Sequence, residues 1–201
     1  ANKLVKDDAT RQKWNEAIAK QYPSDYRALN NMAQQAISKC DVAAAQNYLK
    51  QAANVNKNAS EVNTNLALMA LKSGDVAKAE TYLSKGTGSD TFKEVMGNLN
   101  IAKGNYTQAA SDLAGVNTNS AALAQILAKD YTSAKTTLSK IKNADATTSY
   151  LQAVLAARTG DASALSSSLK NAIQQDGTLA ARAAKDLEFA KYANVVKNLV
   201  K

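Results

Sequence analysis

Apolar residues recur along this chain with the spacing of an amphipathic helix, and a short turn precedes each such stretch. Five stretches share the pattern, and in each the eighth residue after the Asp or Asn of the turn is leucine. The fourth residue is alanine in four of them. Because these offsets fall on one side of an α-helix, each stretch is predicted to bury a narrow apolar stripe. The turn residues are Asp41, Asp75, Asn105, Asp130 and Asp161, the fourth residues are Ala45, Ala79, Ala109, Ala134 and Leu165, and the leucines are Leu49, Leu83, Leu113, Leu138 and Leu169.

A second apolar helix is predicted upstream of the turns, for example over residues 29–39 and 62–73. Each turn therefore joins two helices that fold back on each other. The four turn aspartates stand where a carboxylate accepts hydrogen bonds from the free N–H groups at a helix start. Alternation of β-branched and polar residues, which would predict strands, is not sustained anywhere in the sequence. The pattern predicts an all-α fold built of helix pairs.

These helix pairs resemble the tetratricopeptide repeat, a 34-residue unit with small residues at its eighth and twentieth positions and a Gly-Asp turn between its helices. Residues 26–59 match one unit through Ala33 and Ala45, and residues from 60 onward match the next through Ala67 and Ala79. The interval between turns is 34 residues for the first two, and then 30, 25 and 31. The resemblance implies a right-handed α-solenoid of about five antiparallel helix pairs with a C-terminal capping helix.

The resemblance also implies one continuous domain. Residues 1–25 are predicted to be the second helix of a partial repeat, with Trp14 and Ala17 on its buried side. The chain would then open halfway through a repeat, as a fragment of a longer protein would. The partner expectation is a monomer or a part of such a larger chain. The five predicted repeat units span residues 26–59, 60–89, 90–117, 118–143 and 144–177.

The later part of the chain departs further from the repeat. The fourth unit leaves room for a first helix of only about ten residues, near the short end of what a stable helix pair uses. Residues 178–201 are predicted to form C-terminal capping helices, with Ala184, Leu187 and Ala190 on one side. We therefore expect packing and chain termination, rather than ligand binding, in this part of the chain.

The composition argues against common catalytic chemistry. The chain has no histidine, which excludes histidine-based triads and histidine metal sites. Its single cysteine, Cys40, cannot form an intramolecular disulfide and stands at a turn position that usually holds glycine. We predict no catalytic residue, no metal and no cofactor, and therefore no enzyme. No apolar run approaches the roughly 18 residues that span a membrane, so we expect no membrane insertion.

In the tetratricopeptide family the first helices of the repeats line a concave groove that usually holds the ligand. Asn31 and Asn65 share the sixth position of their repeats, and such amides could pair with the N–H and C=O groups of an extended peptide. The alternative is that these asparagines only reflect an Asn-rich composition. By analogy with the family, the groove residues are Asn30, Asn31, Gln34, Thr64, Asn65, Leu68, Lys93 and Asn98.

We therefore predict a non-catalytic interaction scaffold that binds a peptide or protein segment in the groove. A loose resemblance to Ala/Asn/Lys-rich repeat proteins of bacterial surfaces suggests a bacterial envelope protein, periplasmic or associated with the outer membrane. The alternative is a nucleic-acid or anionic-polymer binding module, because 25 Lys and Arg against 17 Asp and Glu give a net charge of +8. Nucleic acid is the less favoured partner, because the lysines are scattered and lack the Arg-rich or aromatic patches of such binders.

Overall fold

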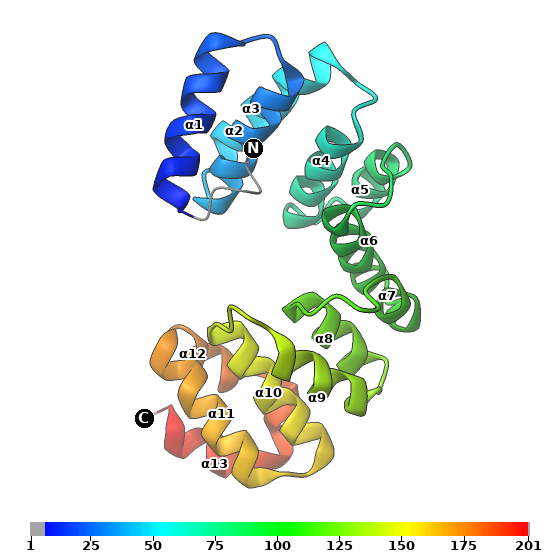
Figure 1. The fold of residues 1–201 in the computed structure, drawn as a ribbon. Coiled ribbons are helices and arrows are strands. Elements are labelled where there is room, and N and C mark those ends of the chain that lie inside the picture. The colour runs from blue at the N-terminus through cyan, green and yellow to red at the C-terminus, as the bar shows by residue number, and fades with distance from the viewer. Residues whose placement is uncertain (1–6, 201) are drawn as a thin grey trace. The chain divides into compact units, whose positions relative to one another are not determined.

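The computed structural model describes residues 7–200, which form helices joined by turns, with no strand among them. The chain divides into two compact units, one ending at Lys103 and the other beginning at Gly104. Figure 1 shows helices α1 to α6 in unit 1 and α7 to α13 in unit 2. Residues 1–6 and 201, which belong to the predicted segments 1–25 and 178–201, lie outside the described residues.

Unit 1 consists of helices that pack against their neighbours in the chain. Helix α2 packs against α3 and α4 against α5, which gives two helix pairs. The first helices of successive pairs are also in contact, α2 with α4 and α4 with α6, while α1 packs against α2. The helices are α1 (Asp8–Gln21), α2 (Tyr26–Ser38), α3 (Val42–Val55), α4 (Ser60–Lys72), α5 (Val76–Leu83) and α6 (Asp90–Ala102).

Unit 2 repeats this arrangement and then ends in shorter elements. Helix α8 pairs with α9 and α10 with α11, and the first helices α8 and α10 are in contact. A 3₁₀-helix, η1, packs against α10, and α13 packs against both η1 and α11. The elements are α7 (Tyr106–Asp112), α8 (Asn119–Leu127), α9 (Tyr131–Lys140), α10 (Ala146–Thr159), α11 (Ala162–Gln175), α12 (Leu179–Ala183), η1 (Leu187–Tyr192) and α13 (Ala193–Leu199).

The predicted fold class is confirmed as all-α, with consecutive packed helix pairs and a C-terminal helix. All five predicted leucines and all five residues four positions after the turns are buried. The four turn aspartates cap the second helices as predicted, with their carboxylates accepting from backbone N–H groups three residues on. The predicted repeat boundaries and the single continuous domain stay predictions.

The turns before the second helices share a left-handed residue. Glycine takes this position in three turns, with φ of 79° at Gly74 and Gly104 and 84° at Gly160. Cys40 and Lys129 take it in the other two, with φ of 58° and 64°. A side chain is disfavoured in this region because its Cβ lies close to the following carbonyl oxygen. Cys40 thus occupies a glycine position, as the sequence predicts.

The predicted buried side of α1 is wrong. Trp14 is 50% exposed and Ala17 is also exposed, whereas Asn15 is buried and donates to Oε1 of Gln35 in α2 at 3.4 Å. Helix α1 contacts α2 through this polar position, so its apolar residues do not form the stripe seen in the second helices.

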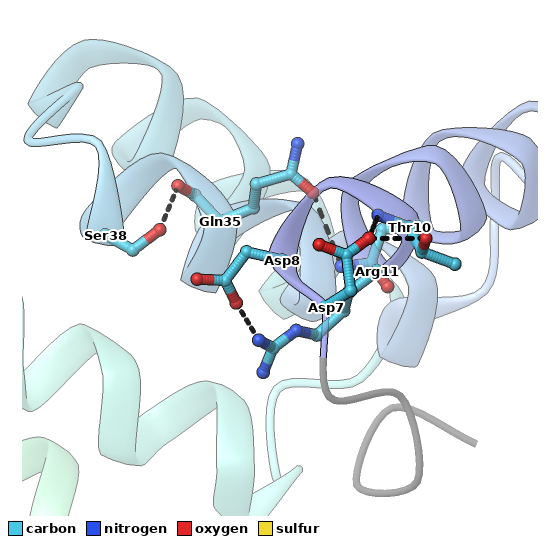
Figure 2. Close-up of polar contacts among 7 residues, drawn as sticks. Asp7, Asp8, Thr10, Arg11, Gln35 and Ser38 are labelled. Carbon is cyan, nitrogen blue, oxygen red and sulfur yellow. Dashed lines mark hydrogen bonds and ion pairs between the residues drawn. The ribbon is translucent and has the colours of Figure 1, made fainter.

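Figure 2 shows polar contacts around the start of α1. The carboxylate of Asp7 accepts from the backbone N–H of Thr10, which caps the helix, and Asp8 forms an ion pair with Arg11. The hydroxyl of Ser38 donates to the backbone carbonyl of Gln35 near the end of α2. Polar side chains therefore stabilise this end of unit 1.

The predicted apolar side of the C-terminal segment is also wrong. Leu187 is 88% exposed, and Ala184 and Ala190 are exposed as well. The expectation assumed that residues 184–190 lie within an α-helix, but α12 ends at Ala183 and a 3₁₀-helix follows, which turns different side chains inward. The residues that this segment buries are Leu179, Ala183, Phe189 and Val196.

Candidate functional site

The eight predicted groove residues all lie on the first helices of unit 1. Helix α2 carries three of them, α4 carries three and α6 carries two. They fall into an interior and an accessible group. Asn30, Thr64 and Asn65 are buried, whereas Asn31, Gln34, Leu68, Lys93 and Asn98 are half-buried or exposed. We call the second group, together with the exposed Lys72 at the end of α4, the accessible first-helix face.

The buried group includes an amide pair that joins α2 to α4. Nδ2 of Asn65 donates to Oδ1 of Asn30 at 2.8 Å, and the two residues are 2% and 4% exposed. Next to them, the Thr64 hydroxyl donates to the carbonyl of Ser60 at 2.8 Å. These side chains hydrogen-bond within the protein. Since a buried amide without a partner costs about 1–3 kcal/mol, the pair helps to fix the packing of the two helices.

The structure gives the asparagines a different arrangement from the predicted amide ladder. Asn65 pairs with Asn30, whereas the ladder placed it in line with Asn31, its equivalent in the repeat. Asn31 is half-buried on the same helix as Asn30. The direct contact of any of the eight residues with a ligand stays a prediction.

The accessible first-helix face contains residues at equivalent repeat positions. Gln34, Leu68 and Asn98 each lie seven residues before the Asp or Asn of the next turn. Gln34 is exposed, and Leu68 and Asn98 are half-buried. Lys72, three residues before Asp75, is exposed at the end of α4 and forms no ion pair among the described residues. The face therefore combines amides, one aliphatic side chain and lysines.

In unit 2 the equivalent face of α10 is covered by the chain's own C-terminal segment. Tyr150, eleven residues before Asp161, is buried, and its hydroxyl donates to Oδ2 of Asp186 at 2.6 Å. Its ring meets the ring of Phe189 edge-on, with centroids 5.5 Å apart. Phe189 is 1% exposed, so η1 inserts an aromatic side chain against α10.

An ion pair at the end of α10 holds the same segment. Nε and Nη2 of Arg158 donate to the two carboxylate oxygens of Glu188 at 2.7 and 2.5 Å. Nη1 of Arg158 also donates to the carbonyl of Ile126, at the end of α8, at 2.9 Å. A bidentate contact of this kind fixes the geometry of both partners. Arg158 therefore ties η1 to two successive first helices.

The electrostatics of this contact follow from its burial and its charges. Burial, followed by the hydrogen bond to Asp186, raises the pKa of Tyr150, so the phenol stays protonated as a donor. The guanidinium of Arg182 lies 4.9 Å from the centroid of the Tyr150 ring. The hydrogen bonds to Glu188 raise the pKa of Arg158. The contact between α10 and η1 therefore combines the Arg158–Glu188 ion pair with the neutral phenol of Tyr150.

Positions in the repeat relate this contact to unit 1. Arg158 lies three residues before its turn aspartate, as Lys72 does, and Val154 lies seven before, as Gln34 and Leu68 do. Val154 and Phe189 belong to the same hydrophobic cluster. The accessible first-helix face of unit 1 is thus the counterpart of a surface that unit 2 uses to hold a chain segment.

A separate pocket of about 430 Å³ lies within unit 2, between α9, α10 and α11. Leu138, Leu155 and Ala156 form its apolar floor. Lys135 of α9, Gln152 of α10 and Ser168 of α11 are among its polar lining residues.

Across residues 7–200 no group of three or more Cys, Asp or Glu side chains lies close enough together to hold a metal ion. Over the same residues, no helix has both the length and the apolar character needed to cross a membrane.

Comparisons with known proteins identify a solved structure with a similar fold. No protein family matches the chain, and no curated protein matches it either. Among solved structures, the chain is similar to PilW, described as a widely conserved type IV pilus biogenesis factor, with a TM-score of 0.62 and 17% identity. The similarity covers 92% of this chain and 90% of PilW. It shows a shared fold and supports the prediction of tetratricopeptide-like helical repeats.

The sequence reasoning missed the contact between α10 and η1 and the pocket in unit 2. A usable signal for the contact was the pair of large polar residues Tyr150 and Arg158 at positions that would face a groove. Their partners Asp186 and Glu188 lie 36 and 30 residues further along the chain, at a distance that periodicity does not reveal.

Proposed function

We propose that this protein is a non-catalytic protein–protein interaction module, and that its accessible first-helix face in unit 1 binds a segment of a partner protein. The observation that carries the proposal is the covering of the equivalent face of α10 by η1. One copy of this repeat surface thus holds a chain segment, and the copy in unit 1 leaves Gln34 and Lys72 exposed. Holding a segment of another chain is the simplest use of that surface.

The contact in unit 2 suggests which partner side chains would fit. There an aromatic ring packs against the cluster that contains Val154, and a carboxylate pairs with Arg158. The equivalent residues in unit 1 are Leu68, which is half-buried, and Lys72, which forms no ion pair among the described residues. A partner segment with an apolar side chain and a nearby carboxylate would meet both.

The proposed setting is the bacterial envelope. It rests on the fold shared with PilW, a type IV pilus biogenesis factor, and on the Ala/Asn/Lys-rich composition. A scaffold of this kind would hold components of an envelope assembly together. Charge-driven binding to an anionic polymer is the competing use of the lysines, and its affinity would fall steeply as salt is raised.

Site-specific photo-crosslinking tests the proposal. A photo-reactive residue is placed at Gln34 or Lys72 on the accessible side of the first helices, and at Gln46 or Lys50 on α3 as matched exposed controls. We expect an adduct with one protein, identified by mass spectrometry, at the first two positions and not at the controls. Equal adducts at all four positions, or none at Gln34 and Lys72, would count against the proposed face.

A charge reversal extends the test. Lys72→Glu should reduce the adduct formed at Gln34, because it places a carboxylate where the partner's carboxylate is expected. Lys50→Glu makes the same change of charge on α3 and should leave the adduct unchanged. A reduction of the same size by both variants would indicate a response to net charge and would support the anionic-polymer alternative.

A further inference from the structure

Two residues in the wall of the pocket between α9, α10 and α11 differ in kind from their equivalents in unit 1. Ser168 lies seven residues after its turn aspartate, where α3 and α5 carry Tyr48 and Tyr82. Gln152 lies nine residues before Asp161, where α4 carries Leu66 before Asp75. In unit 1 the two tyrosines and the leucine pack against hydrophobic clusters. Unit 2 therefore lacks a ring and an aliphatic side chain at the corresponding positions.

The space has the size and character of a small-ligand site. Its volume of about 430 Å³ falls within the roughly 300–1,000 Å³ common for such sites. Leu138, Leu155 and Ala156 are buried, which provides an apolar floor, while Gln152 and Ser168 are half-buried and polar. A planar ring with polar edge atoms would contact both parts of the lining.

The charges that line the pocket select the sign of the ligand. Lys135 is exposed at the pocket and forms no ion pair among the described residues. The other charged lining residue, Asp161, already accepts from the backbone N–H of Ala164, at the start of α11, at 2.9 Å. Lys135 is therefore the charged lining group that a ligand can pair with, which favours a carboxylate.

We propose that this pocket binds an aromatic carboxylate, with its ring on the floor formed by Leu138, Leu155 and Ala156 and its carboxylate near Lys135. The same chemistry is present in a free aromatic acid and in the C-terminal Tyr or Phe of a protein chain. The site lies within unit 2 and does not depend on the first-helix face of unit 1.

The test titrates the full chain with 4-hydroxyphenylacetate and follows its backbone amide resonances by NMR. We expect saturable shifts confined to residues around the pocket. Ser168→Tyr, which restores the residue type of Tyr82, should abolish saturable binding because its ring occupies the space. Ser168→Ala keeps the space and should leave the affinity within about twofold, since it removes only a partly exposed hydroxyl. Lys135→Gln should weaken binding about threefold through loss of one exposed charge contact.

Further experiments distinguish a free aromatic acid from a chain terminus as the ligand, and a second variant covers the case that Ser168→Tyr fails to fold. Gln152→Trp places a large ring in the pocket from the other wall and should also abolish binding, so that the result does not depend on Ser168→Tyr alone. N-acetyl-Gly-Tyr with a free carboxylate and its C-terminal amide are titrated in the same way. Tighter binding of the free dipeptide than of 4-hydroxyphenylacetate indicates a chain terminus as the ligand, and weaker binding indicates a free acid. Absence of saturation by both carboxylates, or unchanged binding to both filled variants, would overturn the proposal.

Discussion

The buried amide pair between Asn30 and Asn65 provides a test of what holds α2 and α4 together. Asn65→Ala removes the donor that Oδ1 of Asn30 receives at 2.8 Å and leaves that oxygen in a residue only 4% exposed. Leaving a buried polar group without its partner costs about 1–3 kcal/mol, so we expect the free energy of unfolding to fall by about 2 kcal/mol. Asn30→Ala should cost a similar amount, because it removes the acceptor of the same bond.

The double variant separates the hydrogen bond from the loss of side-chain packing. Once both amides are gone, no buried partner is left unsatisfied, so the double substitution should cost about 1 kcal/mol less than the sum of the single ones. Asn31→Ala is the matched control. Asn31 is half-buried on the same helix, and its side chain has no hydrogen bond to any residue in 7–200, so its loss should cost less than about 0.5 kcal/mol.

The assay is equilibrium unfolding in urea, followed by the fluorescence of Trp14. This residue is the single tryptophan of the chain and lies in α1 of unit 1, so the signal reports the unit that contains the pair. The reasoning is refuted if Asn30→Ala and Asn65→Ala cost no more than Asn31→Ala, or if the two effects simply add. Intact stability together with lost partner binding in these variants would instead support the predicted ligand role of the two asparagines.

Two further predictions concern the turns. Lys129→Gly should raise the free energy of unfolding of unit 2 by about 0.5–1 kcal/mol, because it relieves the strain of a side chain on the left-handed backbone at φ 64°. The greater freedom of glycine in the unfolded chain offsets part of this gain. Urea unfolding followed by circular dichroism measures the change in stability. Lys170→Gly, at an exposed position inside α11, is the control and should be destabilising. A loss of stability in Lys129→Gly would contradict the strain argument. Stability should also fall as the pH drops below about 4, because the side-chain and backbone hydrogen bonds from Ser133 lower the pKa of Asp130 from 3.8 and the backbone N–H of Lys78 does the same for Asp75. A carboxylate whose pKa is lower in the folded state stabilises the protein above the unfolded pKa, and this stabilisation disappears as the pH falls through the folded pKa. Asp130→Asn should therefore make the free energy of unfolding less dependent on pH while still capping its helix. An unchanged pH dependence would refute this assignment.

The repeated second helices could be predicted because their signals are local. The leucines, the small residues and the turn aspartates lie within eight positions of one another, and helical geometry alone places them on one side. The short first helix of the fourth unit was also predictable, and α8 spans nine residues, Asn119–Leu127. Capping by Asp41 followed from the same reasoning, because its carboxylate needs only the N–H of Ala44, three residues on.

The first and last helices of the described structure were harder to predict, because few other helices pack against them. The repeat pattern favoured Trp14 on the buried side of α1, but the helix contacts α2 around Asn15 instead. The spacing of Ala184, Leu187 and Ala190 favoured one buried side of an α-helix, yet Phe189 enters the core of unit 2 from a 3₁₀-helix while Leu187 is exposed. In both cases the packing surface, rather than the local period, decided which side is buried.

The sequence by itself determined the helix pairs, their capped turns and the buried leucine stripe. Only the tertiary structure decided that Asn65 pairs with Asn30, that Arg158 and Tyr150 hold the C-terminal segment, and that a pocket remains beside Ser168. The physical reason is the distance along the chain: the first set depends on residues within one or two helical turns, whereas the pairing partners lie 30 to 36 residues apart and meet only when the helices pack.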